Sequence, residues 1–418
     1  MEKSGKFRLT SLERNWILYD VGNSAFVLMV ATLIPIFFNA LAAAGGLSSV
    51  EYLAYWGYAS SAVTVITAVL SPILGTVADT KGFKKPIFIL CVFVGIVGCC
   101  AMGAASAWLP FLVIFVIAKV GFSGSLVFYD SMLSDVTTPE RMDEVSSRGY
   151  AWGYIGSCVP FVVCLGLVLG AGSIGISQMT ALNLALLLTA AWWLLTTLPL
   201  LKSYKQLYYV EVEKHAVRQS FARIGHTLRH LPEDKQVFWF LLAFFCYIDG
   251  VYTIIDMATA YGTALGLDTT GLLLALLVTQ IVAFPSALVF GRLSNKYPSA
   301  KLIPVCIAAY AGIAVFAFFL TQQWQFWVLA VIVGMFQGGV QALSRSHFAK
   351  IIPPEKSGEY FGLFDICGKG ASFLGTMIVS VGSQLTGSAN VGVGSLIVLF
   401  IVGFVLFRVS CKKEVVSE

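Results

Sequence analysis

Long apolar stretches, broken by charged and turn-forming residues, dominate the pattern of hydrophobic and polar positions along the chain. A bilayer core about 30 Å thick requires roughly 20 apolar residues in a helix that rises about 1.5 Å per residue. Twelve stretches meet this requirement, at residues 16–44, 52–78, 86–106, 109–136, 146–170, 179–199, 237–264, 269–292, 302–321, 326–350, 359–384 and 392–408. The pattern therefore predicts an all-α integral membrane protein with twelve transmembrane helices. The first stretch is too long for a signal-peptide core and is interpreted as a signal anchor.

The only long hydrophilic stretch separates six apolar segments from six. This predicts an N-terminal six-helix half at 1–200, a central loop at 201–236 and a C-terminal six-helix half at 237–418. Within the loop, apolar residues recur at helical spacing, at Val217, Phe221, Ile224, Leu228 and Leu231. The spacing predicts an amphipathic helix that lies on the inner membrane surface, with a basic partner-binding helix as the alternative.

Lysine and arginine lie on one side of the predicted membrane. Of 27 such residues, 25 fall in loops or segment ends on that side, and the six opposite connections hold none. Cytoplasmic loops retain lysine and arginine, so both termini are expected in the cytoplasm. The net charge of +5 then reflects membrane orientation and gives no indication of nucleic-acid binding.

The amino-acid composition excludes several classes of protein. Charged residues make up 12% of the chain and hydrophobic ones 58%, whereas soluble domains carry roughly 25% charged residues. These values exclude soluble domains, a disordered regulator and a disulfide-stapled secreted protein. The nine cysteines show no Cys-x-x-Cys or Cys/His spacing, so the sequence predicts no disulfide, metal or cofactor.

A pattern repeats between the two predicted halves. The connection after the second segment reads Gly75-Thr-Val-Ala-Asp79-Thr-Lys81-Gly82-Phe-Lys84-Lys85. The one after the eighth segment, 216 residues later, reads Gly291-Arg-Leu-Ser-Asn295-Lys296-Tyr-Pro298-Ser-Ala-Lys301. Half-chain repeats are typical of transporters with alternating access. Six of these positions are candidate gate residues, together with charged residues near the inner surface: Gly75, Asp79, Gly82, Gly291, Asn295, Lys296, Asp130, Asp135, Arg141 and Arg345.

The first copy of the repeat resembles the inner-loop signature of the major facilitator superfamily, in which Gly, Asp and Gly precede basic residues. Further stretches resemble the vacuole-effluxer-like family within it, which includes autophagy-related amino-acid effluxers. They are Trp16-Ile-Leu-Tyr19-Asp20-Val-Gly-Asn23-Ser24-Ala-Phe26, Tyr247-Ile-Asp249-Gly250, and Gly334-Met-Phe-Gln337-Gly338-Gly339-Val-Gln341-Ala-Leu-Ser344-Arg345-Ser346 with Glu359-Tyr-Phe361-Gly362-Leu-Phe-Asp365. The resemblance covers nearly the whole chain.

This resemblance implies the major facilitator fold and a secondary transporter, with relatives that export amino acids from a vacuole or move small solutes in bacteria. In the second copy of the repeat, Asn295 stands where a carboxylate is expected and Pro298 where glycine is expected. The two inner loops therefore need not be equivalent as gates.

Three charged residues fall near the middle of predicted membrane segments. Lys119, Asp249 and Lys369 lie about 10–12 residues from the ends of their segments, which corresponds to a depth of roughly 15–18 Å. Ionisable residues in the membrane usually mark a substrate or ion pathway. The hypothesis is that the two lysines bind the carboxylate of a solute and that Asp249 binds its ammonium group.

Structural pairing is the alternative. Asp365 and Lys369 are spaced i, i+4, which favours an ion pair within one helix. Asp249 has no charged neighbour at these spacings and is also a candidate for the coupling proton site. Further polar candidates are Asp20 and Asn23 in the inner vestibule, with capping or pairing to Arg14 as the alternative for Asp20, Tyr247 from the resemblance, and Gln337 and Gln341 on one face of the tenth segment.

The sequence disfavours other classes of membrane protein. It contains no Gly-x-x-x-x-Gly-Lys-Ser/Thr loop for ATP, and no cluster of His, Asp and Ser near one interface as an enzyme would need. The interpretation is a monomeric secondary transporter, a symporter or antiporter of the plasma membrane, for a small polar solute. Amino-acid efflux, with a proton as the possible coupling ion, is the leading hypothesis. A lipid or organic-anion transporter of the same fold and a non-transporting sensor are the alternatives.

Overall fold

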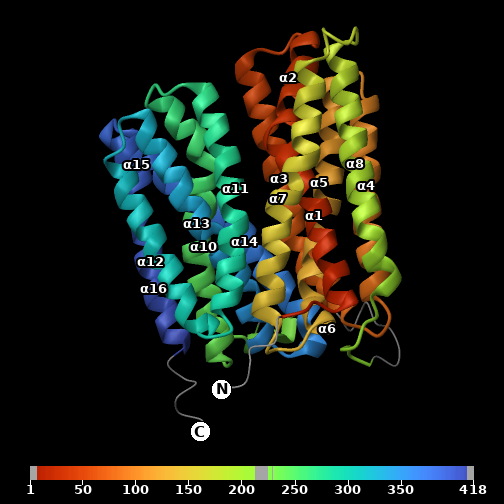
Figure 1. The fold of residues 1–418 in the computed structure, drawn as a ribbon, viewed down its shortest axis with the longest axis vertical. Helices are drawn as coiled ribbons and strands as arrows, with labels where there is room; N and C mark the ends of the chain where they lie inside the picture. The colour runs from red at the N-terminus through yellow and green to blue at the C-terminus, as the bar shows by residue number, and fades with distance from the viewer. Residues whose placement is uncertain (1–6, 212–224, 228, 412–418) are drawn as a thin grey trace.

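The computed structural model describes residues 7–211, 225–227 and 229–411, and its structured elements are helices (Figure 1). In chain order they are α1 (Ser11–Ala31), α2 (Leu33–Ala44), α3 (Ser49–Ala78), α4 (Lys84–Ala104), α5 (Trp108–Ser131), α6 (Leu133–Val136), α7 (Met142–Leu169), α8 (Gln178–Ser203), α10 (Lys235–Ala264), α11 (Thr269–Leu293), α12 (Ser299–Phe318), α13 (Gln323–Ile351), the short 3₁₀ helix η1 (Pro354–Lys356), α14 (Ser357–Thr386), α15 (Ala389–Gly394) and α16 (Ile397–Cys411). Within the described ranges, eleven helical segments are long and apolar enough to cross a membrane, with α1 and α2 counted together. With the 30-residue α14 beside them, the expected twelve-helix layout is consistent with the structure.

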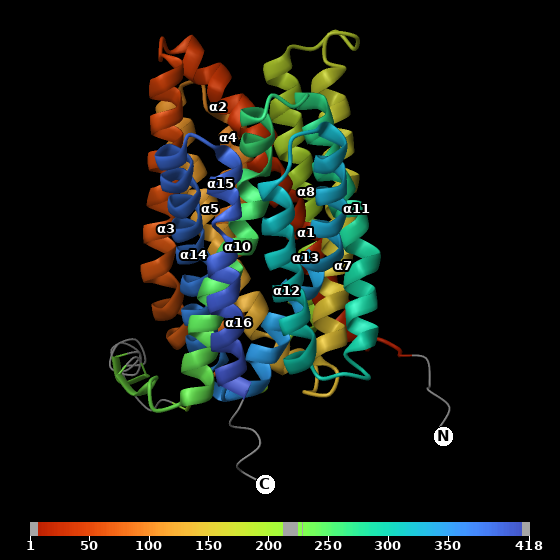
Figure 2. The ribbon, with the colours of Figure 1, turned by 90° about the vertical axis from the view of Figure 1, so that its left-hand side faces the viewer.

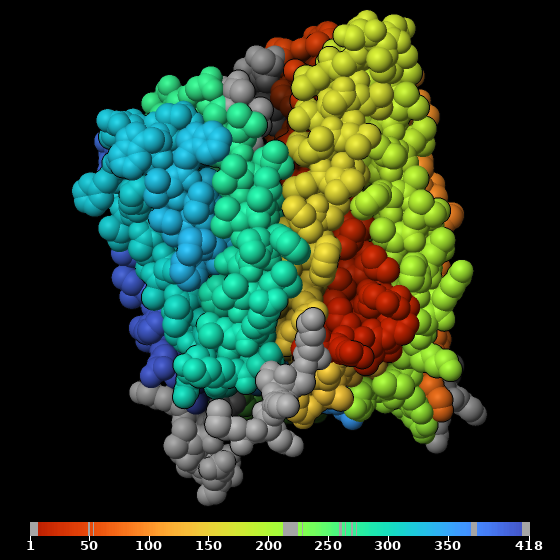
Figure 3. All heavy atoms as spheres, viewed as in Figure 1, coloured from red at the N-terminus to blue at the C-terminus, as the bar shows by residue number. Residues whose placement is uncertain are grey.

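The helices form two bundles side by side, here called the N-half (α1–α8) and the C-half (α10–α16) (Figures 1 and 2). The start of α1 and the end of α16 lie at one end of the molecule, called the terminal end, and the other end is called the opposite end. Within the N-half, α1 packs against α7 and α8, and within the C-half α10 packs against α14 and α16. The halves meet where α3 packs on α14 and α7 packs on α11, and Figure 3 shows the surfaces of α7 and α11 in contact.

The first predicted segment is divided in two. α1 ends at Ala31 and α2 begins at Leu33, with Thr32 outside helical geometry at φ −130°. Pro35 explains the break, because proline has no backbone N–H and its ring clashes with the carbonyl four residues earlier. The last segment is divided in the same way between α15 and α16.

The central loop begins as an ordered strand-like segment. Residues 204–211, called the strap, run from the end of α8 across the terminal end of the N-half. The amphipathic helix predicted further along the loop falls mostly on 212–224 and 228, outside the described residues. Of that helix, 225–227 and 229–230 are described, and they are helical.

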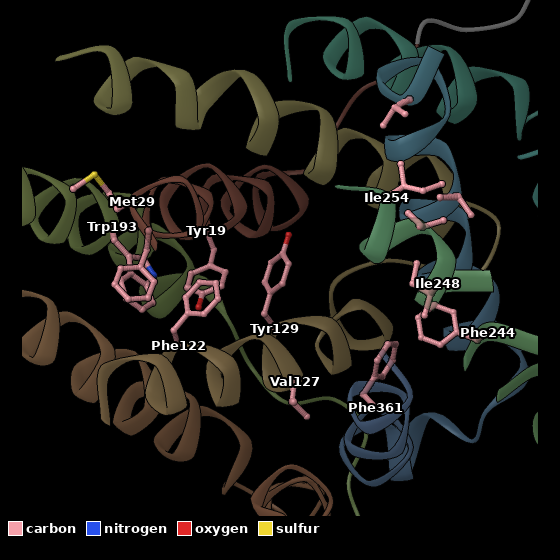
Figure 4. Close-up of a cluster of buried hydrophobic side chains, with 14 of the residues drawn as sticks. Tyr19, Met29, Phe122, Val127, Tyr129, Trp193, Phe244, Ile248, Ile254 and Phe361 are labelled. Atoms are coloured by element: carbon pink, nitrogen blue, oxygen red, sulfur yellow. The ribbon is translucent and has the colours of Figure 1, made fainter. Parts of the chain in front are cut away.

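Aromatic packing holds the helices of the N-half together (Figure 4). Tyr19 of α1 lies 4.8 Å from Tyr129 of α5 between ring centroids, and Phe122 lies 5.7 Å from Trp193 of α8. The Tyr19 hydroxyl donates a 2.6 Å hydrogen bond to Ser125. These buried, packed rings give this half a frame on which charged side chains are positioned.

Candidate functional site

The two halves approach most closely at the terminal end, where α3 and α14 touch backbone to backbone. A Cβ atom on Gly75 would lie 2.1 Å from the carbonyl oxygen of Gly358, and one on Gly362 would lie 2.6 Å from Cα of Pro72. Both distances are far below van der Waals contact, so this approach requires glycine on both helices. Gly75, a predicted gate residue, therefore lies at the centre of this interface, here called the terminal-end contact.

Asp79, the residue after α3, binds the first turn of α14. Its Oδ1 accepts a hydrogen bond from the Gly358 N–H at 2.7 Å, and its Oδ2 accepts one from the Glu359 N–H at 2.8 Å. The free N–H groups and dipole at a helix N-terminus favour a negative charge there. Burial raises the pKa of Asp79 to about 7, against the opposing effects of Lys84 and the two N–H donors. The terminal-end contact thus holds a carboxyl group that titrates near neutral pH.

Asp135, in α6, joins the N-half, the strap and the C-half. It lies 3.3 Å from Lys84 Nζ and accepts a 2.6 Å hydrogen bond from the Tyr204 hydroxyl. The backbone N–H groups of Leu207 and Tyr208 each donate to Asp135 Oδ1 at 3.0 Å. Lys84 in turn donates to Ser357 Oγ of the C-half at 2.9 Å. Asp135 and Lys84 are buried, so each compensates the charge of the other in a site without water.

The strap also binds the loop between α3 and α4. Gln206 accepts a hydrogen bond from the Gly82 N–H at 3.0 Å and donates one to the carbonyl of Ala78 at 3.1 Å. Gly82 has φ +80°, a left-handed conformation in which only glycine is free of strain. The Val210 N–H donates to the Asp79 carbonyl at 2.8 Å. The sequence shows only a polar stretch here, so it did not predict that the strap holds this loop.

The second copy of the repeat lies at a different part of the terminal end, against α7. A Cβ atom on Gly291 would lie 2.9 Å from Cβ of Ser147, and Asn295 Nδ2 donates to Glu144 Oε2 at 2.6 Å. Lys296 is exposed, with its Nζ 5.3 Å from the Tyr297 ring. An amide therefore takes the place of the carboxylate found in the first copy, and it donates where Asp79 accepts. The two loops are not equivalent in their contacts.

Arg345 of α13 inserts into the N-half. Its Nη1 lies 2.9 Å from Asp130 Oδ1 and 3.8 Å from Asp20 Oδ2, and its Nε donates to Ser146 Oγ at 2.9 Å. Asp20 thus pairs with an arginine of the other half, whereas the sequence offered Arg14 as its partner. The sequence did not reveal this pair because Arg345 is 325 positions away along the chain and meets Asp20 only in the tertiary structure. Asn23 Nδ2 donates to the Tyr19 carbonyl at 3.1 Å.

Arg141 does not cross between the halves. Its Nη2 lies 2.7 Å from Glu13 Oε2 and its Nε donates to Glu13 Oε1 at 2.8 Å. The Thr137 hydroxyl donates to the same carboxylate at 2.6 Å. Arg141 therefore connects the start of α7 to the start of α1, both within the N-half.

Lys119, one of the three midplane charges, lies on α5 of the N-half, and its positive charge acts electrostatically on Asp256 of α10 in the C-half. Lys119 Nζ lies 4.7 Å from the centroid of the Phe122 ring. Tyr252, one turn before Asp256, lies within electrostatic range of Asp130, Asp256 and Asp365. Asp256 follows Asp249 by seven residues, a spacing of two helical turns on one face. That signal was present in the sequence, which nevertheless left Asp256 without a role.

Asp249 is fully buried between α10 and α14 of the C-half. Its Oδ1 accepts hydrogen bonds from the Gly375 N–H at 2.9 Å and from the Thr253 hydroxyl at 3.3 Å. Its Oδ2 has no hydrogen-bond partner among the described atoms. The side chain of Lys369, the third midplane residue of the sequence hypothesis, lies outside the described part of the chain. The described hydrogen bonds of Asp249 are therefore with residues of the C-half.

The remaining polar candidates divide between inter-half and intra-half contacts. Gln341 accepts a 2.6 Å hydrogen bond from the Tyr154 hydroxyl of the N-half, and Asp365 accepts one from the Ser71 hydroxyl at 2.7 Å. Gln337 is buried, and its Oε1 has no hydrogen-bond partner among the described atoms. The Tyr247 hydroxyl lies 2.6 Å from Ser344 Oγ, within the C-half. Gln341 and Asp365 thus belong to the interface between the halves, whereas Tyr247 makes its contact within the C-half.

The sequence of this chain is similar to a known protein family along most of its length. The profile of the family described as "Vacuole effluxer Atg22 like" matches residues 11–415. An uncharacterized MFS-type transporter, YxiO, of Bacillus subtilis (strain 168) is 42% identical over 404 residues, which cover 96% of this chain and 94% of that protein. Autophagy-related protein 22 of Saccharomyces cerevisiae (strain ATCC 204508 / S288c) is 27% identical over 283 residues, 58% of this chain and 53% of that protein.

Solved structures of major facilitator transporters share the fold. The human organic anion transporter MFSD10 (TETRAN) superposes with a TM-score of 0.72 at 15% identity, over 94% of this chain and 99% of that one. The transporter FucP, in the outward conformation, gives a TM-score of 0.71 at 16% identity, over 96% and 98% of the two chains. The proton:xylose symporter XylE gives 0.69 at 9% identity, over 94% and 93%.

Proposed function

Because the chain belongs to the vacuole effluxer Atg22-like family of major facilitator transporters, we propose that it exports amino acids by alternating access, driven by a proton gradient or by the gradient of the solute itself. Family members and structural neighbours are transporters and not enzymes. The finer proposal depends on charges that lie between the two halves, and it names a substrate class, a binding pair and a proton site.

The electrostatic attraction between Lys119 of the N-half and Asp256 of the C-half supports the proposed substrate class. An amino acid bears one carboxylate and one ammonium group, and these match a lysine and an aspartate of opposite halves. A solute that binds both residues connects the halves, and its binding energy then depends on how far apart the halves are. The polar groups of Tyr154 and Gln341 add neutral donors and acceptors at the same interface.

Alternating access is the proposed mechanism at the terminal end. Positive-inside bias in the loops assigns this end to the cytoplasm, and similarity to a bacterial transporter supports the plasma membrane as the location. The contacts of Asp79, Lys84 and Arg345 join the two halves at the terminal end in this structure. Export requires them to separate so that a cytoplasmic solute can enter. The residues of the terminal-end contact are therefore proposed as the cytoplasmic gate.

Counterflow into proteoliposomes tests the substrate class. Vesicles loaded with an unlabelled amino-acid mixture should accumulate at least one labelled amino acid above empty vesicles, and Lys119→Met should reduce that uptake at least 10-fold because the solute carboxylate loses its partner. Lys301→Met is the matched control, since Lys301 is exposed at the start of α12 and should leave uptake unchanged. Uptake of an organic anion but no amino acid, by folded protein, would replace this substrate class with the alternative one.

Asp249 is the proposed coupling-proton site, because a buried carboxyl with one oxygen lacking a hydrogen bond can gain and lose a proton within the C-half. Asp249→Asn keeps the size of the side chain and removes its titration. We expect this variant to retain exchange of labelled for unlabelled solute but to lose accumulation driven by an imposed pH gradient. Gradient-driven accumulation equal to that of the wild type would show that Asp249 has no coupling role.

A further inference from the structure

The hydrogen bonds, ion pairs and ring contacts described for the Arg345 guanidinium form a cage built from residues of the N-half. Its two carboxylates come from Asp20 of α1 and Asp130 of α5. A third polar contact comes from Ser146 of α7, whose hydroxyl accepts from Arg345 Nε at 2.9 Å and whose carbonyl accepts from Nη2 at 3.0 Å. All three residues lie on helices of the half opposite to Arg345. The guanidinium of Arg345, a residue of the C-half, is therefore bound in a site that residues of the N-half form.

Aromatic rings complete the walls of the cage. The guanidinium carbon lies 4.3 Å from the ring centroid of Tyr150, 4.7 Å from that of Trp16 and 5.4 Å from that of Tyr129. A cation held over the faces of several aromatic rings is stabilised by their negative electrostatic potential, most strongly when water is excluded. Such cages recognise organic cations in general, since the ring faces attract the charge whatever molecule carries it.

The N-half holds these walls without help from Arg345. Trp16 and Tyr129 stack with centroids 4.3 Å apart and 14° between planes, and Trp16 Nε1 donates to the Tyr129 carbonyl at 2.9 Å. Figure 4 shows Tyr129 beside Tyr19 in the buried aromatic cluster. Gly149 leaves room for the Arg345 guanidinium, because a Cβ atom there would lie 3.1 Å from both Arg345 Nη2 and Asp20 Oδ2. The cage is therefore preformed in one half.

The charge of the cage is balanced from outside that half. Among the described residues, the ion pairs of Asp20 and Asp130 are both with Arg345. The nearby arginines of the N-half have other partners, since Arg141 pairs with Glu13 and Arg148 with Glu144. When the halves separate at the terminal end, Arg345 leaves with the C-half. The buried carboxylate of Asp20, the partly exposed carboxylate of Asp130 and three ring faces are then left without a cation, which is costly unless another cation replaces it.

We propose that this cage is a binding site for a solute that carries a guanidinium group, and that Arg345 occupies it as a tethered competitor when the terminal end is closed. The inference rests on the alternating-access mechanism proposed above and deepens it by naming a basic amino acid of the arginine type as the substrate class. The planar fork of a guanidinium matches the fixed positions of Asp130 and Ser146, which a compact ammonium group matches less well. Solute and Arg345 exclude each other, so solute bound in the cage holds the terminal end open.

Calorimetric titration of methylguanidinium into protein in nanodiscs tests the cage without reference to transport. Arg345→Ala removes the competitor, so methylguanidinium should bind at least 10-fold more tightly than to the wild type. The double variant Arg345→Ala with Asp130→Asn should lose that gain. Arg345→Lys keeps a tethered cation that fits the cage less well, so its affinity for methylguanidinium should lie between those of the wild type and Arg345→Ala. Where Arg345→Ala does not yield folded protein, Arg345→Gln serves in its place.

Equal binding by the wild type and the Arg345→Ala or Arg345→Gln variant would overturn the proposal. A gain in affinity that survives Asp130→Asn would also overturn it, because the ligand would then bind elsewhere. Counterflow measured on the same wild-type preparation reports separately on transport. If methylguanidinium does not bind in the cage but amino-acid counterflow is intact, the proposed function stands. If it binds in the cage but no amino acid shows counterflow, only the proposed function is overturned.

Discussion

Replacing Asp135 with alanine should destabilise the folded protein by about 3–5 kcal/mol, because it leaves a buried lysine without its carboxylate. Asp135 lies 3.3 Å from Lys84 Nζ, and both side chains are inaccessible to water. The remaining carboxylate, Asp79, is 4.0 Å from Lys84 and already accepts two backbone hydrogen bonds. The substitution also removes the acceptor for Tyr204 and for two N–H groups of the strap. Unfolding free energies measured by steric trapping in lipid would give the size of the loss.

Two further variants define the cause of that loss. Glu140→Ala removes an exposed carboxylate five residues away and should leave the unfolding free energy unchanged. Asp135→Ala combined with Lys84→Met removes both charges, and should recover part of the stability because no uncompensated charge remains. An Asp135→Ala protein as stable as the wild type would mean that the buried charge network does not hold the terminal end together.

Replacing Gly75 with leucine should reduce transport by about 100-fold or more, because the terminal end can no longer close. A Cβ atom at this position would lie 2.1 Å from the Gly358 carbonyl oxygen, and the opposing atom is backbone that cannot rotate away. Overpacking of a tight contact costs about 1–3 kcal/mol, and a penalty of about 2.7 kcal/mol on the closed state lowers its population about 100-fold. Initial rates of counterflow at saturating solute would show the effect.

Gly57 of the same helix provides the matched control. It is exposed, and a Cβ atom there would meet no atom within 4 Å. Gly57→Leu should therefore transport at the wild-type rate, although it adds the same side chain to the same helix. Wild-type transport by the Gly75→Leu protein would show that closure of α3 on α14 is not part of the transport cycle.

The sequence predicts the helices well because membrane spans are determined by local composition. A run of about 20 apolar residues in a bilayer forms a helix, because every backbone polar group must find its hydrogen bond within the segment. The break between α1 and α2 was not predicted, although Pro35 is its visible cause. The strap was also missed, since hydrogen bonds from Gln206 and the backbone leave no periodic pattern in the sequence.

Candidate site residues were found by type and depth, but their partners were not. The depth of Lys119 follows from residue counts, whereas its electrostatic interaction with Asp256 depends on how the two halves are assembled. In the same way, the charge at Asp20 was noted, but its pairing with Arg345 needs both halves to be assembled. Local sequence fixes the position along a helix, and tertiary packing decides which charges meet. The functional roles of all these residues stay predictions until they are tested.

Alternating access can be tested directly by distance measurements between spin labels at both ends of the molecule. Labels on non-natural amino acids at Thr138 and Lys296 span the two halves at the terminal end, and labels at Ser173 and Thr321 span them at the opposite end; all four positions are exposed. We expect two populations at each end, and a solute that shifts them should lengthen one distance while it shortens the other. Distances that stay fixed with transported solute, or that change in the same direction at both ends, would contradict the mechanism proposed for this protein.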